Sequence, residues 1–436
     1  MSLQLAQLFD LSLERDIRER LGRLPDTLEK AYDEIYNQIR LQKGSAPEIA
    51  NRAFQWVMCS CAPLSPAKLI GAICQDPETD NLNEVDITID FVLGACRNLL
   101  TVDKQLDVCK FSHLSVQEYC ETRHWSQKEA NTAVAKVCLS LLNHPACQLQ
   151  DTKNPEATLG SIAPLNQYAR IYWATHVQRC EGQGHESRLS SLLNGFLGSG
   201  SESGPAYRHW HEAVKKDMEN KTYKRTHLHS IYPQLSPPTV NSLPICTFGF
   251  HDLVLDWWRA APRDIEQLNS RNQTLLQLAS AGGHISVARE LLDLDANVNA
   301  RSEEYGSALQ AAASEGHEGM VKLLLEKDAD VNAQDEYGFS VLHAASKGGY
   351  ENIVKLLLET KADVNAQGGR YGNALLTAAE LGHEGTVKLL LEAGADDNAQ
   401  GRVWRNALQR GIKMKQSMGE QQMEALSRYN ESRRLV

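Results

Sequence analysis

The 436-residue chain lacks the motifs on which most nucleotide-dependent and hydrolytic enzymes rely. It contains no Gly-Lys dipeptide, so the phosphate-binding pattern G-x-x-x-x-G-K-[ST] is absent. Segments 317–321 and 383–387 begin with His-Glu, as a zinc-protease motif does, but each ends in Val where a second His is needed. The Gly- and Ser-rich stretch 198–204 lacks the G-x-S-x-G pattern of a hydrolase. We therefore expect no catalytic residues and no enzyme activity.

Long apolar runs and ordered cysteine pairs are missing as well. No apolar run approaches the roughly 18–20 residues that span a bilayer, and residues 1–4 do not begin a basic and then apolar leader. The ten cysteines are scattered, and only Cys59 and Cys61 lie close together. This spacing favours neither a disulfide framework nor a zinc site. We expect a cytoplasmic protein with free thiols, no metal and no cofactor.

The second half of the chain is built from repeated units of one constant length. Each unit has a leucine, then a small residue that lets two antiparallel helices approach, then a glycine suited to a left-handed helix end. Paired leucines in the following helix can be buried only against a neighbouring unit, so the pattern predicts a stacked array of helix pairs. The periodic positions are Leu243, Leu276, Leu309, Leu342, Leu375 and Leu408, the glycines Gly283, Gly316, Gly349 and Gly382, and the closing asparagines Asn299, Asn332, Asn365 and Asn398.

These units resemble ankyrin repeats closely from about residue 272 to 399 and more loosely from Ser242. In that family each repeat opens with Thr-Pro-Leu-His. Here the proline is lost, while the leucine and a capping Thr, Ser or Asn are kept at Thr274, Ser307, Ser340 and Asn373. The style of the repeats looks like that of arrays from filamentous fungi. The resemblance implies a solenoid of α-helix pairs with β-turn fingers, which binds another protein.

The first half is also predicted to be mainly α-helical, with a small winged-helix domain. Three helices followed by a hairpin give that expectation. The third helix carries only Arg97 as a basic residue, so it offers no electrostatic footprint for DNA. The segments are two amphipathic helices over 14–39 that are interrupted at Pro25, helices over 53–59, 63–69 and 91–100, and a hairpin of 101–103 with 107–111.

This half resembles the region after the nucleotide-binding NACHT domain in fungal NACHT–ankyrin proteins of the innate-immunity receptor type. Residues 113–119, His-Leu-Ser-Val-Gln-Glu-Tyr, look like its closing motif. The resemblance implies that His113 could reach nucleotide phosphates if a NACHT domain were supplied. The alternative is that His113 caps the helix of Tyr119. Without a P-loop, we expect the C-terminal half of such a protein, from a truncated gene, a wrong gene start or a genuine short form.

We therefore expect six regions, and the fold class is mainly α. Asn406-Ala407-Leu408 begins a further unit, and we expect 413–433 to form a polar capping helix or to fray. The regions are a helical remnant after a NACHT core (1–44), a winged-helix-like domain (45–125), a helical spacer (126–198), a flexible linker (199–241), about five ankyrin repeats of which the first is degenerate (242–400), and an incomplete repeat with a C-terminal cap (401–436).

Charge and resemblance together indicate a protein partner. Residues 242–400 hold 12 Lys and Arg against 24 Asp and Glu, which disfavours a phosphate backbone, so we expect no nucleic acid as a ligand. Because no apolar run is long enough to span a bilayer, we expect no membrane as a ligand either. The resemblance places partner contacts on the turns between repeats and the exposed side of the first helices. Alternatively, each tyrosine only covers its own turn. The candidate residues are Glu304, Tyr305, Ser314, Glu315, Glu336, Tyr337, Lys347, Arg370, Tyr371, Glu380 and Trp404.

Two functions fit these expectations. The first is a non-enzymatic protein–protein interaction module, the sensing or scaffolding part of a NACHT–ankyrin type signalling protein. The second is a regulatory remnant of a nucleotide-dependent switch that acts with a separate NTPase domain. Neither the partner nor the oligomeric state follows from the sequence.

Overall fold

The computed structural model describes residues 28–80, 83, 87–148, 162–180, 187–198, 202–219, 228, 231–260, 264–302, 306–368 and 372–396. The chain divides into two compact units. Unit 1 contains the described residues up to 196 together with 205–214, and unit 2 contains 197–204 and the described residues from 215 onward. Both units are mainly helical, which confirms the expected fold class.

Unit 1 packs its helices mainly against one another, and some of them also contact an antiparallel hairpin. The hairpin pairs Leu100 with Phe111 and Asp103 with Val108. Ser126 begins the longest helix of the unit with a reciprocal capping box to Glu129, which satisfies two backbone amides at that end. The elements are α3 (Leu28–Arg40), α4 (Ala46–Cys59), α5 (Pro66–Ile73), α6 (Ile89–Ala95), β1 (Leu100–Asp103), β2 (Val108–Phe111), α7 (Leu114–Arg123), α8 (Gln127–Asn143), α9 (Pro145–Gln148), α11 (Ala163–Gln178), α12 (Ser187–Leu197) and α13 (Pro205–Glu219).

The order α4, α5, α6, β1, β2 matches the expected sequence of three helices and a hairpin. An order of elements does not identify a family, so the winged helix stays a prediction. The expected third helix over 91–100 is wrong at its end. Helix α6 stops at Ala95 because Arg97 and Asn98 have positive φ angles of 49° and 61°, and Leu100 already belongs to β1.

The expected flexible linker over 199–241 is wrong for residues 205–219, which form α13. Tyr207 and Trp210 are buried on this helix, and the Trp210 ring meets Trp173 edge-on with centroids 5.7 Å apart. The indole N–H of Trp210 donates to the Arg170 carbonyl at 2.9 Å. Burial of these aromatic rings stabilises the helix. The Gly, Ser and Pro residues on either side of it are typical of a flexible linker, so the sequence did not predict a helix here.

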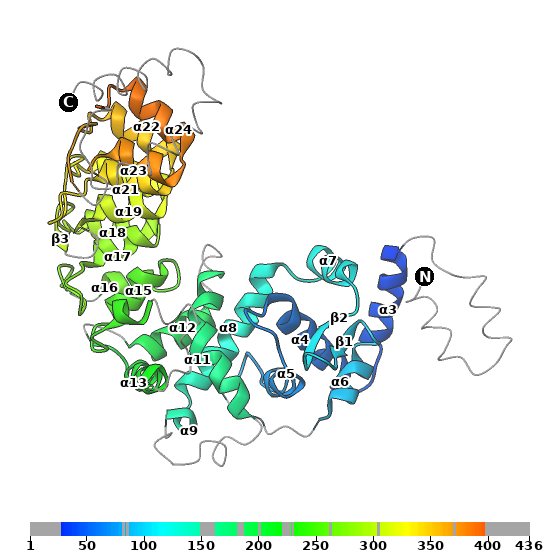
Figure 1. Ribbon diagram of the computed structural model, residues 1–436. Helices are drawn as coiled ribbons and strands as arrows, with labels where there is room; N and C mark the ends of the chain where they lie inside the picture. Colours follow the sequence, from blue (N-terminus) through cyan, green and yellow to red (C-terminus); the bar gives the residue numbers. More distant parts are fainter. Residues whose placement is uncertain are drawn as a thin grey trace. The chain divides into compact units, whose positions relative to one another are not determined.

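Unit 2 is a stack of helix pairs, in which each pair follows the last along the green-to-orange part of the chain (Figure 1). First helices begin at 242, 275, 308, 341 and 374, which is the constant spacing expected from the sequence. The pairs are α15 (Ser242–Phe248) with α16 (Leu255–Ala260), α17 (Leu275–Ala281) with α18 (Ile285–Asp293), α19 (Ala308–Glu315) with α20 (Glu318–Glu326), α21 (Val341–Gly348) with α22 (Glu351–Glu359), and α23 (Ala374–Leu381) with α24 (Glu384–Glu392); the 3-10 helix η2 (Tyr232–Leu235) precedes them.

Short hairpin fingers precede the first helices from α17 to α23. Strands β3 (Arg301–Ser302) and β4 (Gly306–Ser307) form one of them, and single β-bridges take the same place in the others. Each first helix from α17 to α23 begins at the expected Thr, Ser or Asn, whose side-chain oxygen accepts a backbone N–H three residues later. The four expected glycines, Gly283, Gly316, Gly349 and Gly382, all have positive φ.

Polar side chains join each repeat to the next. Asn332 accepts the Asp363 N–H at 2.7 Å and its amide donates to the Lys361 carbonyl at 3.5 Å. Asn299 and Asn365 make the corresponding two contacts one repeat earlier and one repeat later. These three asparagines therefore link neighbouring loops through hydrogen bonds to the backbone.

Three histidines also contact the backbone of the preceding repeat. His284, His317 and His383 each place Nε2 3.0 Å from a carbonyl oxygen of the preceding repeat. Each ring also lies over a glycine at the end of the preceding first helix. These imidazoles stabilise repeat junctions and do not converge on one site.

Candidate protein-binding surface

The ends of successive first helices form one exposed row. Ser314 on α19 and Lys347 on α21 are exposed, and Glu380 on α23 is partly exposed. They occupy the same position in three successive repeats, and α19, α21 and α23 pack side by side in that order, so the three side chains follow one another along the array. Glu315 is exposed beside Ser314. We call these four residues the helix-end row.

The finger of the fourth repeat, residues 335–339, is fixed by its own aspartate. Asp335 Oδ1 accepts the backbone N–H of Tyr337 at 2.9 Å and that of Phe339 at 2.8 Å. Gly338, with φ 73°, completes the turn. Glu336 is exposed, and the Tyr337 side chain is 71% exposed. The backbone therefore presents a large aromatic ring and a carboxylate to solvent.

Other candidate residues of the fingers lie outside the described residues. These are Glu304, Tyr305, Arg370, Tyr371 and Trp404. The structure thus places six of the eleven candidates, four in the helix-end row and two on one finger.

Two glutamines that the sequence analysis did not assign to the site hold the fingers in place. Gln277 Nε2 donates to the carbonyls of Ala300 and Gly306, both at 3.0 Å, on the finger of the next repeat. Gln310 Nε2 likewise donates to the Phe339 carbonyl at 2.5 Å. The available signal was the position of these glutamines, which replace the His of Thr-Pro-Leu-His.

His113 caps α7. Its Nδ1 accepts the Ser115 backbone N–H at 3.2 Å and lies 2.7 Å from the Ser115 hydroxyl, which in turn is 2.7 Å from the Tyr32 hydroxyl. This is the capping role that the sequence left open. A role toward a nucleotide stays a prediction.

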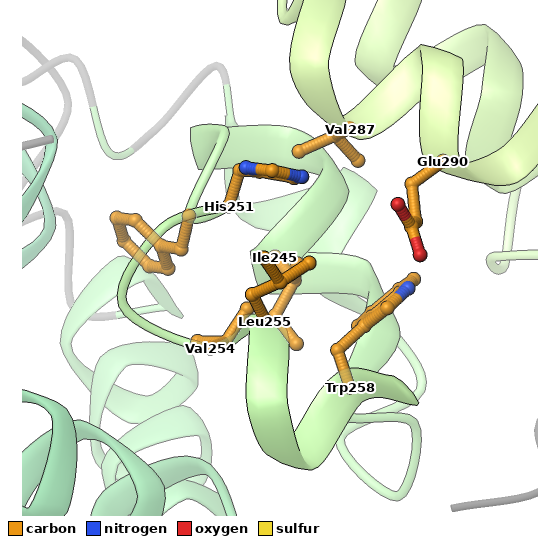
Figure 2. Close-up of a pocket in the computed structure, with 8 residues that line it drawn as sticks. Ile245, His251, Val254, Leu255, Trp258, Val287 and Glu290 are labelled. Atoms are coloured by element: carbon orange, nitrogen blue, oxygen red, sulfur yellow. The ribbon is translucent and has the colours of Figure 1, made fainter. Parts of the chain in front are cut away.

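A small pocket in unit 2 lies among α15, α16 and α18 at the start of the array. Figure 2 shows its mostly apolar wall, with Ile245, Trp258 and Val287, and one carboxylate, Glu290. Arg259 binds both oxygens of Glu290 at 2.6 and 2.7 Å, and this hydrogen-bonded guanidinium lowers the pKa of Glu290. A paired, ionised carboxylate in an apolar pocket is not poised as a general acid or base.

In unit 1 the half-buried Cys61 lies near the buried His176. Cys61 Sγ lies 3.7 Å from His176 Nε2, which also meets the Tyr168 hydroxyl at 2.8 Å, while His176 Nδ1 meets Asn131 Oδ1 at 2.8 Å. Burial lowers the pKa of His176 to about 3 and raises the pKa of Cys61. The imidazole therefore stays neutral and the thiol protonated, which is the opposite of an activated thiolate–imidazolium pair.

The described residues hold no grouping of three or more His, Cys, Asp or Glu side chains that suits a metal ion. Within the same part of the chain, every helix is too short or too polar to cross a membrane.

Comparisons with known proteins match the array. The family described as "Ankyrin repeats (many copies)" matches residues 275–325 and 309–358, and the family described as "Ankyrin repeat" matches 372–402. Ankyrin repeats are therefore confirmed for this part of the chain, and no catalytic family is indicated.

A fungal protein is similar over a longer stretch. "Azaphilone pigments biosynthesis cluster protein L" of Monascus ruber is 29% identical over 312 residues, covering 64% of this chain and 61% of that protein. The chain thus matches less than two thirds of the relative's length. Residues from 242 onward make up less than half of the present chain, so the similarity also includes part of the preceding region.

Proposed function

We propose that this chain is a non-enzymatic protein–protein interaction module whose ankyrin array binds a protein partner through the helix-end row and the fingers. The observation that carries the proposal is the finger of residues 335–339. Asp335 and Gln310 hold its backbone, while Tyr337 stays largely exposed. Ankyrin repeats as a family support protein binding and give no indication of a reaction.

Rigid presentation makes this surface suited to binding. A tyrosine has few rotatable bonds, so it buries a large area with little loss of conformational entropy. A fixed backbone lowers the ordering cost of association further. The ends of the first helices carry charges of both signs, at Glu315, Lys347 and Glu380. These charges would set the orientation of a bound partner and the specificity for it.

The finer context is also a proposal. The chain would be the sensing or scaffolding part of a NACHT–ankyrin type signalling protein, as its two resemblances suggest. The similarity to the fungal protein extends beyond the array into the preceding region, so the array and part of that region occur together in a second protein. The alternative is a regulatory remnant that acts with a separate NTPase domain, in which His113 would face the nucleotide.

A charge-reversal comparison within one repeat tests the binding surface. Glu315 at the end of α19 and Glu326 at the end of α20 are both exposed, so Glu315→Arg and Glu326→Arg change charge equally on two different faces. The partner is first isolated by cross-linking to the tagged full chain, and its Kd is then measured for each variant. We expect Tyr337→Ala to weaken binding at least about tenfold, Glu315→Arg to weaken it, and Glu326→Arg to leave it unchanged.

The same experiment can refute the proposal. Unaltered affinity in folded Tyr337→Ala and Glu315→Arg variants would show that the contact face lies elsewhere. A triple change of Tyr305, Tyr337 and Tyr371 to Ala then decides whether any finger tyrosine contributes or whether each only covers its own turn.

A further inference from the structure

The first helices of the array carry different side chains at one position of their caps. In the second and third repeats this position is Gln277 and Gln310, and each Oε1 atom accepts the backbone N–H of the capping residue at 2.9 Å. The fourth repeat has His343 there, and the fifth has Leu376. An amide and a leucine do not titrate, whereas an imidazole binds a proton at about pH 6.5. Among these four positions, that of α21 alone can respond to pH.

His343 holds the start of α21 in its neutral form. Its Nδ1 atom accepts the Ser340 backbone N–H at 3.2 Å and lies 2.7 Å from the Ser340 hydroxyl. The Ser340 hydroxyl oxygen accepts the backbone N–H of His343 at 3.3 Å, which completes a capping box. Because Nδ1 accepts a hydrogen bond, the proton of the neutral ring lies on Nε2.

A second proton on this ring would remove the cap. The His343 side chain is fully buried, and a proton on Nδ1 would face the Ser340 N–H, which then loses its acceptor. Burial is the largest influence on His343 and lowers its pKa, whereas hydrogen bonding with the Gly372 backbone and the charge of Asp335 act in the opposite direction. The structure therefore opposes the charged imidazolium at this position.

The helices packed against α21 bring no charge to His343. At the same position in their repeats, α19 has Gln310 and α23 has Leu376, which are both uncharged. The buried residues of α22 are Ile353, Val354 and Leu357. Among the described residues, Asp335 is thus the charged group that acts on His343, and it does not offset the effect of burial.

We propose that His343 is a proton-sensitive cap, so that in acid the protonation of this one imidazole opens the start of α21 and loosens the finger of residues 335–339. The cap and the finger share a residue, because Ser340 also pairs with Gln334 in the β-bridge at the base of the finger. The ring of Phe339, the last residue of the finger, lies 5.2 Å from the His343 ring. Loss of the cap therefore removes a support directly behind the finger.

The consequence for binding rests on the proposed function, whereas the opening itself does not. The same finger presents Tyr337 to solvent. A partner that contacts Tyr337 would then bind more weakly in acid, because the finger would have to be ordered again on association.

Hydrogen exchange of the full chain between pH 7.5 and 5.0, resolved for each helix by mass spectrometry, tests the cap. The control is His343→Gln, because Gln310 shows that a glutamine makes the same contacts without titrating. The intrinsic rate of exchange changes with pH, so the chain and the variant are compared at each pH. Since the pKa of His343 is lower in the folded chain than in the opened one, protection is lost as pH falls below 6.5. We expect exchange at the start of α21, relative to His343→Gln, to rise by up to about tenfold per pH unit, and that of α17 to stay equal.

A second variant keeps the test decisive if glutamine disturbs the fold. His343→Leu introduces the residue that the fifth repeat uses, and the chain should show the same rise relative to it. The proposal is overturned by a ratio that stays constant over this pH range against both variants, or by an equal rise in α17. It is also overturned if the His343 ring, followed by nuclear magnetic resonance, titrates at or above 6.5.

Binding is measured separately, with the partner isolated by cross-linking. A Kd that rises in acid for the chain but less for His343→Gln supports both the cap and the role of the finger. If exchange at α21 rises as expected while the Kd changes equally in both proteins, the cap stands and the contact assigned to the finger is refuted.

Discussion

Gly316→Ala is expected to destabilise the array far more than Gly382→Ala, although both glycines have φ 81°. An alanine in the left-handed conformation costs about 1–2 kcal/mol, and both variants incur this. Among the described residues, an aromatic ring lies above Gly316 and none lies above Gly382. The added Cβ would lie 2.5 Å from Cε1 and 2.6 Å from Cζ of Tyr350. That ring also lies against Gly348, so its room to move away is restricted.

The overlap adds a further cost at Gly316 alone. Inserting a methyl group into a packed junction typically costs about 1–3 kcal/mol. We therefore expect a loss of about 2–5 kcal/mol for Gly316→Ala and about 1–2 kcal/mol for Gly382→Ala. Tyr350→Ala in the Gly316→Ala background should recover part of the difference, because the double variant has no overlap.

Hydrogen exchange gives the free energy of local opening for each repeat, and a urea titration of the same samples gives the overall loss. The amides of α19 and α20 should lose protection in Gly316→Ala, and those of α23 and α24 in Gly382→Ala. Equal losses for the two glycines, or strict additivity of Gly316→Ala with Tyr350→Ala, would refute the idea that the ring fills the space above Gly316.

Two further predictions concern unit 1 and nucleotides. Buried His176 has its pKa lowered to about 3 from 6.5, so between these values the unfolded chain binds a proton that the folded chain does not, and stability should fall by up to about 1.4 kcal/mol per pH unit as pH drops from 6.5 to 3. His176→Gln should flatten this slope in urea titrations followed by tryptophan fluorescence, and an unchanged slope would contradict the assignment. Because the P-loop sequence is missing, isothermal titration with Mg–ATP should show no binding. Micromolar affinity would overturn that expectation, and His113→Ala would then test whether His113 takes part.

The array could be predicted from sequence because each repeat carries several local signals for where its helices begin and end. Ser307 and Ser340 mark helix starts, Gly316 and Gly349 mark helix ends, and their common spacing fixes the unit. Such local signals do not depend on distant residues. Gln310 both caps its own helix and donates to the next finger, 29 residues away; its position in the repeat marks the cap, but no neighbouring residue indicates the distant contact.

Unit 1 was harder to predict because its elements depend on tertiary contacts. Trp210 stabilises α13 through Trp173 and the Arg170 carbonyl, which no local pattern near residue 210 reveals. The turn at Arg97 and Asn98 likewise ends α6 without a glycine. At the candidate surface, sequence located Tyr337 on an exposed turn, while its part in binding stays a prediction.

The hydrogen bonds from the periodic asparagines to the backbone of the next repeat have an evolutionary consequence. Asn332 bonds to a main-chain N–H and a main-chain carbonyl of the next repeat, and these groups are present whatever side chains that repeat carries. The asparagine contacts therefore need no matching substitution when a neighbouring repeat is duplicated, deleted or exchanged, whereas the ring of each junction still needs a glycine beneath it. Where that glycine is kept, we expect the exposed residues of a repeat to be inherited as a set, so that the proposed binding surface can change one whole repeat at a time.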